Sequence, residues 1–346
     1  MIELKTLLVL LFFLTLEIAI LFFLVISLVN QKIYYYIQTI RYHRMRVRMT
    51  TKIIDYLERP RSFIPDKIFN QPFELLSVME TFNHRLKGGE WEELKKAIAA
   101  HYLLPKARKR AKSWFWRKRN FAARVFSVMP LVQDQALILA LIRDSVFLVR
   151  SIASIAAVEL NLKEGVEQTL LYMAQEFRYA RCFYRDILLQ GSVQTFSTIA
   201  DIASKSRDPA IHLASLELFA GNTVTCPLPI LQQDLESPDA EIRRNAVKAL
   251  IQNPLKESEK ILLAHLKDPD EEVRAEAALG LSHFMHPQTF SILNNLLKDP
   301  SWKVKLKAAT ALKRMGNKGM AILKKQDRVE NKLAYEVARY AMDFLD

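Results

Sequence analysis

The residue types that most often carry catalysis are scattered along this chain. Its 346 residues include seven histidines and two cysteines, Cys182 and Cys226. His283 and His286 are close in sequence, but no cysteine accompanies them at the spacing of a zinc site. The sequence has no glycine-rich phosphate-binding motif and no serine or cysteine nucleophile motif. We therefore predict that the protein is not an enzyme and that it binds neither a metal nor a cofactor.

A long apolar segment near the N-terminus predicts attachment to a membrane. Residues 6–29 are apolar except for Glu17 and three small hydroxyl side chains. A helix rising about 1.5 Å per residue makes this segment long enough to cross a hydrocarbon core of about 30 Å. The alternative is a signal peptide, but the apolar run is too long for one and no small-x-small cleavage site follows Val29. We interpret residues 1–30 as a retained transmembrane anchor.

The charges that flank this segment predict its orientation. Lys5, offset by Glu3, precedes it, whereas six cations follow it: Lys32, Arg41, Arg44, Arg46, Arg48 and Lys52. The positive-inside rule places the N-terminus outside and the rest of the chain in the cytoplasm, with the anchor in the inner (plasma) membrane. Two cysteines cannot form a disulfide framework, which suits a reducing compartment. We expect residues 31–72 to form a basic juxtamembrane helix and a linker.

Glu17 is a costly residue in such a segment. A carboxylate at the middle of a span is unfavourable by about 2.5–3.5 kcal/mol on insertion scales. One alternative is that a very apolar span simply tolerates a single acid, which stays protonated. Ionisable residues inside membranes usually serve a function, so we favour a contact between Glu17 and a polar or basic group on a partner's transmembrane helix.

Three segments further along the chain repeat one pattern: SPDAEIRRNAVKAL, DPDEEVRAEAALGL and DPSWKVKLKAATAL. Their prolines are 31 residues apart, and a proline after Asp or Ser is typical of a helix start. Steps of 31 residues reach a basic residue or a histidine each time: Arg119, Arg150, Arg181, His212, Arg243, Arg274 and Lys305. A small residue follows three places later in every repeat except at Tyr184. We conclude that helical hairpins are stacked with this period.

This pattern resembles the short, 31-residue kind of HEAT repeat over residues 105–346, with a looser hairpin at 73–103. The resemblance implies an all-α fold, a HEAT-like α-solenoid over residues 73–346 preceded by a single transmembrane helix. It also implies a concave face, lined by the second helices, that holds a protein partner.

In that family the loop Asp and the second-helix Arg form a hydrogen-bonded ladder between repeats. Asp268, Arg274, Asp299 and Lys305 match this pattern. His212 departs from the family's Arg, and the Asp–Pro turn before it is two residues closer, so the resemblance implies an interruption of the ladder there. The basic series is accordingly expected to be structural rather than ligand-binding.

Residues 106–119, KARKRAKSWFWRKR, hold eight basic residues and no acid. The alignment places Trp116 on Trp302 and Arg119 on Lys305, which makes both ordinary features of a helix-opening turn. The remaining charges have three interpretations: a solvated helix face, a contact with anionic lipid or an acidic partner, or a nucleic-acid site. We favour lipid or an acidic partner, since the anchor makes nucleic acid unlikely. The candidate patch consists of Lys106, Arg108, Lys109, Arg110, Lys112, Trp114, Phe115, Arg117 and Lys118.

These observations predict a membrane-anchored cytoplasmic scaffold or adaptor. Its partner is expected to be an integral membrane protein, in a setting such as a glycosyltransferase or polysaccharide-export assembly. Metal-dependent hydroxylases of HEAT-like architecture carry paired His-Glu dipeptides, and no histidine of this chain is followed by glutamate. The alternative is a lyase-type enzyme or chaperone acting on a pigment or protein, as in the HEAT-like bilin lyases, although no residue of this sequence selects that role.

Overall fold

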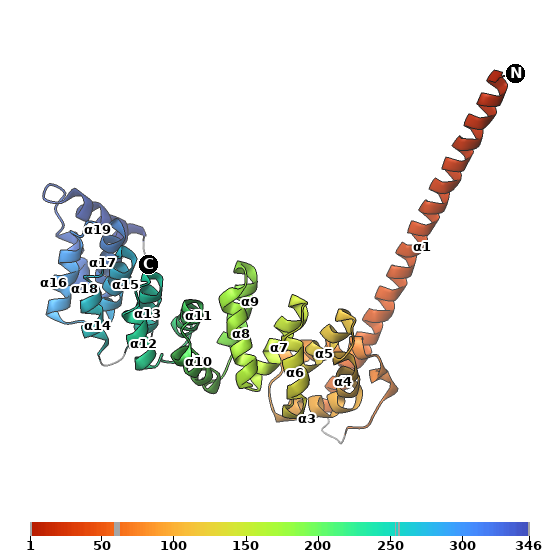
Figure 1. Cartoon of the computed structure of the whole chain (residues 1–346), viewed down its shortest axis with the longest axis horizontal. Coiled ribbons are helices and arrows are strands. Elements are labelled where there is room, and N and C mark those ends of the chain that lie inside the picture. Colours follow the sequence, from red (N-terminus) through yellow and green to blue (C-terminus); the bar gives the residue numbers. More distant parts are fainter. Residues whose placement is uncertain (1, 59–62, 253, 255–256, 345–346) are drawn as a thin grey trace. The chain divides into compact units, whose positions relative to one another are not determined.

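The computed structural model describes residues 2–58, 63–252, 254 and 257–344, leaving out the side chains of residues 2–13 and of Arg178. Over these ranges the chain is helical, with turns and loops between the helices and no strand. It forms two compact units, Met1–Met129 and Pro130–Asp346 (Figure 1). The all-α fold expected from the 31-residue pattern is confirmed.

The first unit is built on one very long helix, α1 (Ile2–Glu58), seen in red and orange in Figure 1. Its described apolar part is exposed, whereas Met49, Ile53 and Tyr56 near its end are buried. The end of α1 packs on α2 (Pro72–Arg85) and on the short 3-10 helix η1 (Lys67–Asn70). Residues 59–62 of the expected linker lie outside the described residues.

A second long helical run completes this unit. It consists of α3 (Gly89–Ile98), a π-helical turn η2 (Ala99–Leu103) and α4 (Leu104–Ala111) without a break. Pro105 lacks an N–H and crowds the preceding turn, so the wider π turn before it accommodates the proline within the helix. Helix α5 (Trp116–Val128) then packs back on α4.

The second unit repeats the helical hairpin. Its first helices and connecting turns are η3 (Val132–Asp134), α6 (Gln135–Ile142), α8 (Lys163–Gln175), α10 (Val193–Lys205), α12 (Leu228–Leu235), α14 (Ser258–His265), η4 (Leu281–His283), α16 (Pro287–Leu296) and α18 (Asn317–Lys324). Its second helices are α7 (Phe147–Glu159), α9 (Arg178–Leu189), α11 (Pro209–Ala220), α13 (Ala240–Gln252), α15 (Glu271–Gly280), α17 (Trp302–Arg314) and α19 (Lys332–Phe344). Consecutive second helices pack on one another from α7 to α19, so the hairpins stack as the repeat predicts.

The small residues of the pattern lie where second helices meet. Ala246, Ala277 and Ala308 are fully buried on α13, α15 and α17, and Ser215 is buried on α11. Short side chains at this position let neighbouring helices approach closely. Tyr184 occupies the same position on α9 and is also fully buried, so this repeat accommodates a large ring where the others hold alanine or serine.

Candidate functional site

The regular part of the basic series ties successive hairpins together. Arg243 on α13 donates from Nε and Nη2 to the two carboxylate oxygens of Asp268, both at 2.8 Å. Its Nη1 donates to the carbonyl of Ser237, at 2.9 Å, in the turn before its own helix. Arg274 repeats this arrangement with the carbonyl of Asp268 at 2.8 Å and the carboxylate of Asp299 at 3.4 Å. The turn that holds Asp268 is therefore bonded to two consecutive second helices.

These pairs are partly buried and ionised. The hydrogen bond to Asp268 raises the pKa of Arg243 above its ordinary value. Burial alone would raise the pKa of Asp268, but the bond from Arg243 and a backbone N–H outweigh it and lower that pKa. A buried charge that loses its partner is costly, so the geometry gives Arg243 and Asp268 a structural task.

His212 differs from the expectation of an interrupted ladder. Its Nε2 lies 3.1 Å from the carbonyl of Ser206, six residues earlier, as in the arginine positions. Its Nδ1 lies 2.7 Å from Oδ1 of Asp234, and both side chains are almost fully buried. The contact with Asp234 raises the pKa of His212 above its ordinary value. The ladder continues at His212 because an acid on the neighbouring first helix, α12, takes the place of the loop aspartate.

The two preceding positions also find acids outside the expected pattern. Arg150 pairs with Glu176 and donates from Nε to the hydroxyl of Tyr184 at 3.1 Å. Burial raises the pKa of Tyr184 to about 12, so its hydroxyl stays protonated. Arg181 pairs with Glu217 at 2.8 Å. Sequence spacing did not indicate these acceptors, since each lies at a different distance along the chain from its arginine.

Arg119 and Lys305 stand at the two ends of the series. Arg119 donates from Nη1 to the carbonyls of Ser113 and Trp114, at 3.0 and 2.5 Å, in the turn before its own helix. Lys305 is buried on α17, and no carboxylate pairs with it among the described residues.

Glu17 lies on the apolar part of α1, where all the described side chains are exposed. Leu14–Glu58, the part of α1 whose side chains are described, is the one candidate membrane span in the described residues, by length and hydropathy. A signal sequence near the N-terminus passes the same test.

The predicted basic patch divides into an inward and an outward part. The guanidinium of Arg110 lies over the rings of Phe73 and Phe121, 4.8 and 4.3 Å from their centroids, so it belongs to the packing of α2, α4 and α5. Lys106 and Arg108 are half-buried on α4. The exposed cations are Lys109, Lys112, Arg117 and Lys118.

The outward part surrounds a pair of aromatic rings. Residues 112–115, which we call the α4–α5 turn, join the two helices. Trp114 is 81 % exposed at its tip, and its ring centroid lies 4.1 Å from that of Phe115. The ammonium of Lys118 lies 5.4 Å from the Phe115 centroid. The turn thus presents two adjacent aromatic rings, tilted by 39° to one another and flanked by cations.

A second exposed apolar surface lies on the second helices of the other unit, and the sequence reasoning missed it. Leu148 on α7 and Tyr179 on α9 are 31 residues apart and both exposed. Phe183 stands one turn after Tyr179 and packs its ring 6.0 Å from that of Phe147. We call Leu148, Phe177, Tyr179 and Phe183 the second-helix patch. The signal was available, because aromatic side chains at i and i+4 of α9 stand at positions where α13 to α17 carry mostly charged residues.

Groups of three or more potential metal ligands do not occur in the part of the chain that the structure describes.

Part of the repeat region matches a known family. Residues 227–313 and 259–327 match the family described as HEAT repeats. The solved structures to which the chain is similar include the Escherichia coli protein YibA, at 16 % identity and a TM-score of 0.38 over 75 % of this chain and 99 % of that one. Another is Kap121p bound to Pho4p, at 12 % identity and a TM-score of 0.39 over 84 % of this chain and 43 % of that one. A search of curated proteins gives no match. Residues 227–327 are thus HEAT-like repeats, and the ladder joins successive hairpins within them.

Proposed function

We propose that this protein is a membrane-anchored scaffold that binds a protein partner through the second helices of its repeats. The observation that carries the proposal is the second-helix patch. Leu148, Tyr179 and Phe183 expose apolar side chains on α7 and α9, at repeat positions where α13 to α17 carry mostly charged residues. Exposed apolar surface costs solubility, and contiguous apolar patches mark places where partners bind.

The composition of the patch favours a protein as its occupant. Aromatic side chains and arginine are enriched at the cores of protein interfaces, whereas lysine and acids are depleted there. Arg181 and Arg185 lie on the same helix as the patch and are both held by Glu217 of α11. We expect apolar side chains of the partner to cover the aromatic rings and polar groups to meet this charged border.

Helix α1 supplies the proposed attachment to the membrane. Its apolar segment is long enough to span the hydrocarbon core, and the cations from Lys32 to Lys52 follow it directly. By the positive-inside rule the repeats would lie in the cytoplasm, beneath the inner membrane. Glu17 would contact a polar group on a partner's transmembrane helix. An accessory subunit of a glycosyltransferase or polysaccharide-export assembly is one setting that fits these features.

A pull-down from native membranes tests the proposal. The tagged full chain is extracted in mild detergent and its partners are identified by mass spectrometry. We expect a stoichiometric partner that is lost from the double variant Tyr179→Ala, Phe183→Ala. The matched control is Leu333→Ala, Tyr340→Ala, which removes two exposed apolar side chains from α19, the last of the second helices.

Glu17→Leu separates the two contacts. A partner that the patch variant retains and Glu17→Leu loses would place recognition in the membrane instead of on the repeats. Purification of the parent protein alone, with no partner from native membranes, would contradict the scaffold function.

A further inference from the structure

We propose that the α4–α5 turn is a second membrane contact, which lies on anionic lipid at the same bilayer surface that α1 enters. This inference rests on the proposed role of α1 as a membrane span. It follows from the direction in which three helices of the first unit run, and from the side chains that this direction carries to the level of the lipid headgroups.

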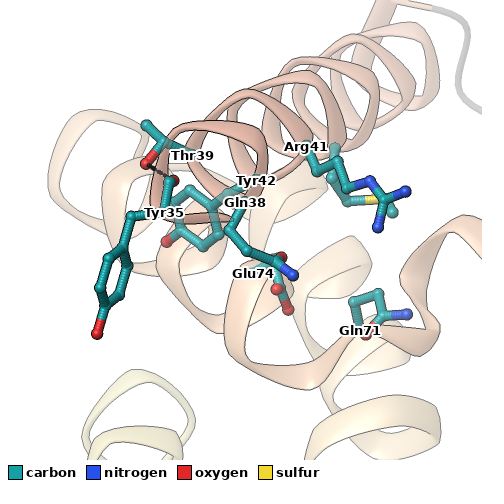
Figure 2. A pocket seen from close by; sticks show the side chains of 8 residues that line it. Tyr35, Gln38, Thr39, Arg41, Tyr42, Gln71 and Glu74 are labelled. Carbon is teal, nitrogen blue, oxygen red and sulfur yellow. Dashed lines mark hydrogen bonds between the residues drawn. The ribbon is translucent and has the colours of Figure 1, made fainter. Parts of the chain in front are cut away.

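Helix α2 runs in the same direction as α1. At its start, Gln71 and Glu74 face Gln38 and Arg41 of α1 across a groove of about 470 Å³ (Figure 2). Near its end, α2 lines another groove with a later part of α1, where Phe82 and Arg85 of α2 meet Arg46, Thr50 and Ile54. The start of α2 is therefore the end closer to the apolar segment of α1.

Helix α5 runs in this direction as well. Phe73, at the start of α2, packs its ring 4.9 Å from the Phe121 ring of α5. Further along both helices, Glu80 of α2 accepts a hydrogen bond of 2.8 Å from Nε of Arg124 on α5. The later residue of α2 therefore contacts the later residue of α5, so the two helices run parallel. The part of α5 before Phe121 then extends past the start of α2 towards the apolar segment of α1. The α4–α5 turn forms the tip of that extension.

The lengths place this tip at the headgroup layer. Residues 38–41 of α1 lie about 14–18 Å beyond the end of the apolar run at Val29, at about 1.5 Å per residue. Trp116 lies about 7 Å closer to the apolar segment than Phe121, at about 1.5 Å per residue of α5. The α4–α5 turn and its side chains extend several ångströms further in the same direction. Trp114 then lies within about 10 Å of the hydrocarbon boundary, and the headgroup layer on each side is about 5–8 Å thick.

The side chains at the tip suit that layer. Trp114 is the most exposed tryptophan among the described residues, and tryptophan favours the interface between headgroups and hydrocarbon. Lys109, Lys112, Arg117 and Lys118 are exposed around it, and the chain has no acid between Glu93 and Asp134 to neutralise them locally. Each cation near an anionic bilayer surface contributes about 1 kcal/mol of attraction. A partner protein or a nucleic acid would meet the same charges, but neither explains why the aromatic tip is turned towards the membrane side of the unit.

Quenching of tryptophan fluorescence by lipid tests this contact in the full chain. The protein is reconstituted through α1 into nanodiscs of phosphatidylcholine, with or without phosphatidylglycerol. A fraction of the phosphatidylcholine is brominated high on the acyl chain, where it quenches interfacial tryptophan. We expect quenching in the phosphatidylglycerol discs that Trp114→Phe largely removes. The matched control Trp302→Phe replaces a tryptophan of the second unit that is also exposed and should leave the quenching unchanged.

Neutralising the charges completes the test. We expect a variant to lose the part of the quenching that depends on phosphatidylglycerol when four cations are replaced: Lys109→Gln, Lys112→Gln, Arg117→Gln and Lys118→Gln. The control removes the same number of charges from exposed positions of the second unit: Arg314→Gln, Lys318→Gln, Lys324→Gln and Lys325→Gln. Equal quenching in the parent and in Trp114→Phe would overturn the inference and leave an acidic protein or nucleic acid as the occupant. Failure of the parent to stay in the discs after alkaline carbonate treatment would instead overturn the membrane span itself.

Discussion

Two turns at the same position of the 31-residue repeat differ in what they contact. The turn before α17, Asp299–Trp302, is bonded to the preceding repeat. Asp299 accepts from Arg274, and Ser301 donates from its hydroxyl to Glu271 at 2.7 Å. In the α4–α5 turn, Ser113 stands where Asp299 stands, and its hydroxyl accepts only a local hydrogen bond of 3.3 Å from the N–H of Phe115.

The difference follows from the residue that precedes each turn by 25 positions. Arg274 precedes Asp299 and Arg243 precedes Asp268, so an arginine stands ready to meet each carboxylate. The residue 25 positions before Ser113 is Gly88, which begins α3 with a φ of +137° and has no side chain to donate. Without a donor from an earlier repeat, an aspartate at this turn would gain no ladder contact. The comparison teaches that the same turn joins repeats where a donor precedes it and is left outward where none does.

The largest expected effect comes from breaking the joined kind of turn. Asp268→Ala removes the carboxylate that holds Arg243 and leaves a half-buried guanidinium without its partner. We expect the free energy of unfolding to fall by about 3 kcal/mol, as for other buried ion pairs that lose one member. Urea unfolding followed by circular dichroism, on the full chain in mild detergent, measures this change.

The control for this substitution is Asp239→Ala. Asp239 is exposed and accepts a hydrogen bond only from the N–H of Glu241, at the start of its own helix. Loss of a helix cap costs about 1 kcal/mol. Equal losses in the two variants would mean that the ladder adds nothing beyond capping, and the comparison between the two turns would fail.

The sequence predicted the ladder contacts where the spacing between arginine and aspartate is regular. Asp268 and Asp299 follow their arginines by 25 residues, and the expected bonds are present. The residues 25 positions after Arg150, Arg181 and His212 are Gln175, Ser206 and Ser237, none of which carries a charge. Glu176, Glu217 and Asp234 serve these positions from other places on the neighbouring helices. A one-dimensional period cannot indicate such substitutes, because only the packing of helices brings them into contact.

The candidate surfaces were predictable to different degrees. The charge run was plain from the sequence, but the inward turn of Arg110 between Phe73 and Phe121 depends on α2, which the repeat pattern does not cover. The second-helix patch needed knowledge of which face of α9 the neighbouring helices leave open. Tyr184 and Phe183 are adjacent aromatic residues, yet one is fully buried and the other is exposed.

A smaller effect is expected from His212, the member of the series that titrates near neutral pH. The contact with Asp234 raises the folded-state pKa of His212, so the pair stabilises the fold fully below the unfolded-state value of about 6.5. That contribution is lost as the pH rises through the raised folded-state pKa. The stability difference between the parent and His212→Gln should therefore be larger in mildly acidic than in mildly alkaline buffer.

His212→Arg is the control for this pH dependence. Arginine keeps its charge throughout, so its stability difference from His212→Gln should not change over the same pH range. A parent that shows no pH dependence relative to His212→Gln would mean that the imidazole is held by shape alone. The joined turns would then differ from the α4–α5 turn in packing and not in charge.

The smallest expected effect comes from giving the outward turn the residue of the joined one. Ser113→Asp introduces the ladder acceptor where Gly88 offers no donor, so the free energy of unfolding should change by less than about 0.5 kcal/mol, as for ordinary surface substitutions. The reverse exchange, Asp299→Ser, should destabilise the protein clearly because Arg274 loses its carboxylate partner. Urea unfolding of the two variants under identical conditions measures both changes. A substantial gain in stability from Ser113→Asp would show that the α4–α5 turn has a donor within reach, and that its outward position does not result from the missing side chain at Gly88.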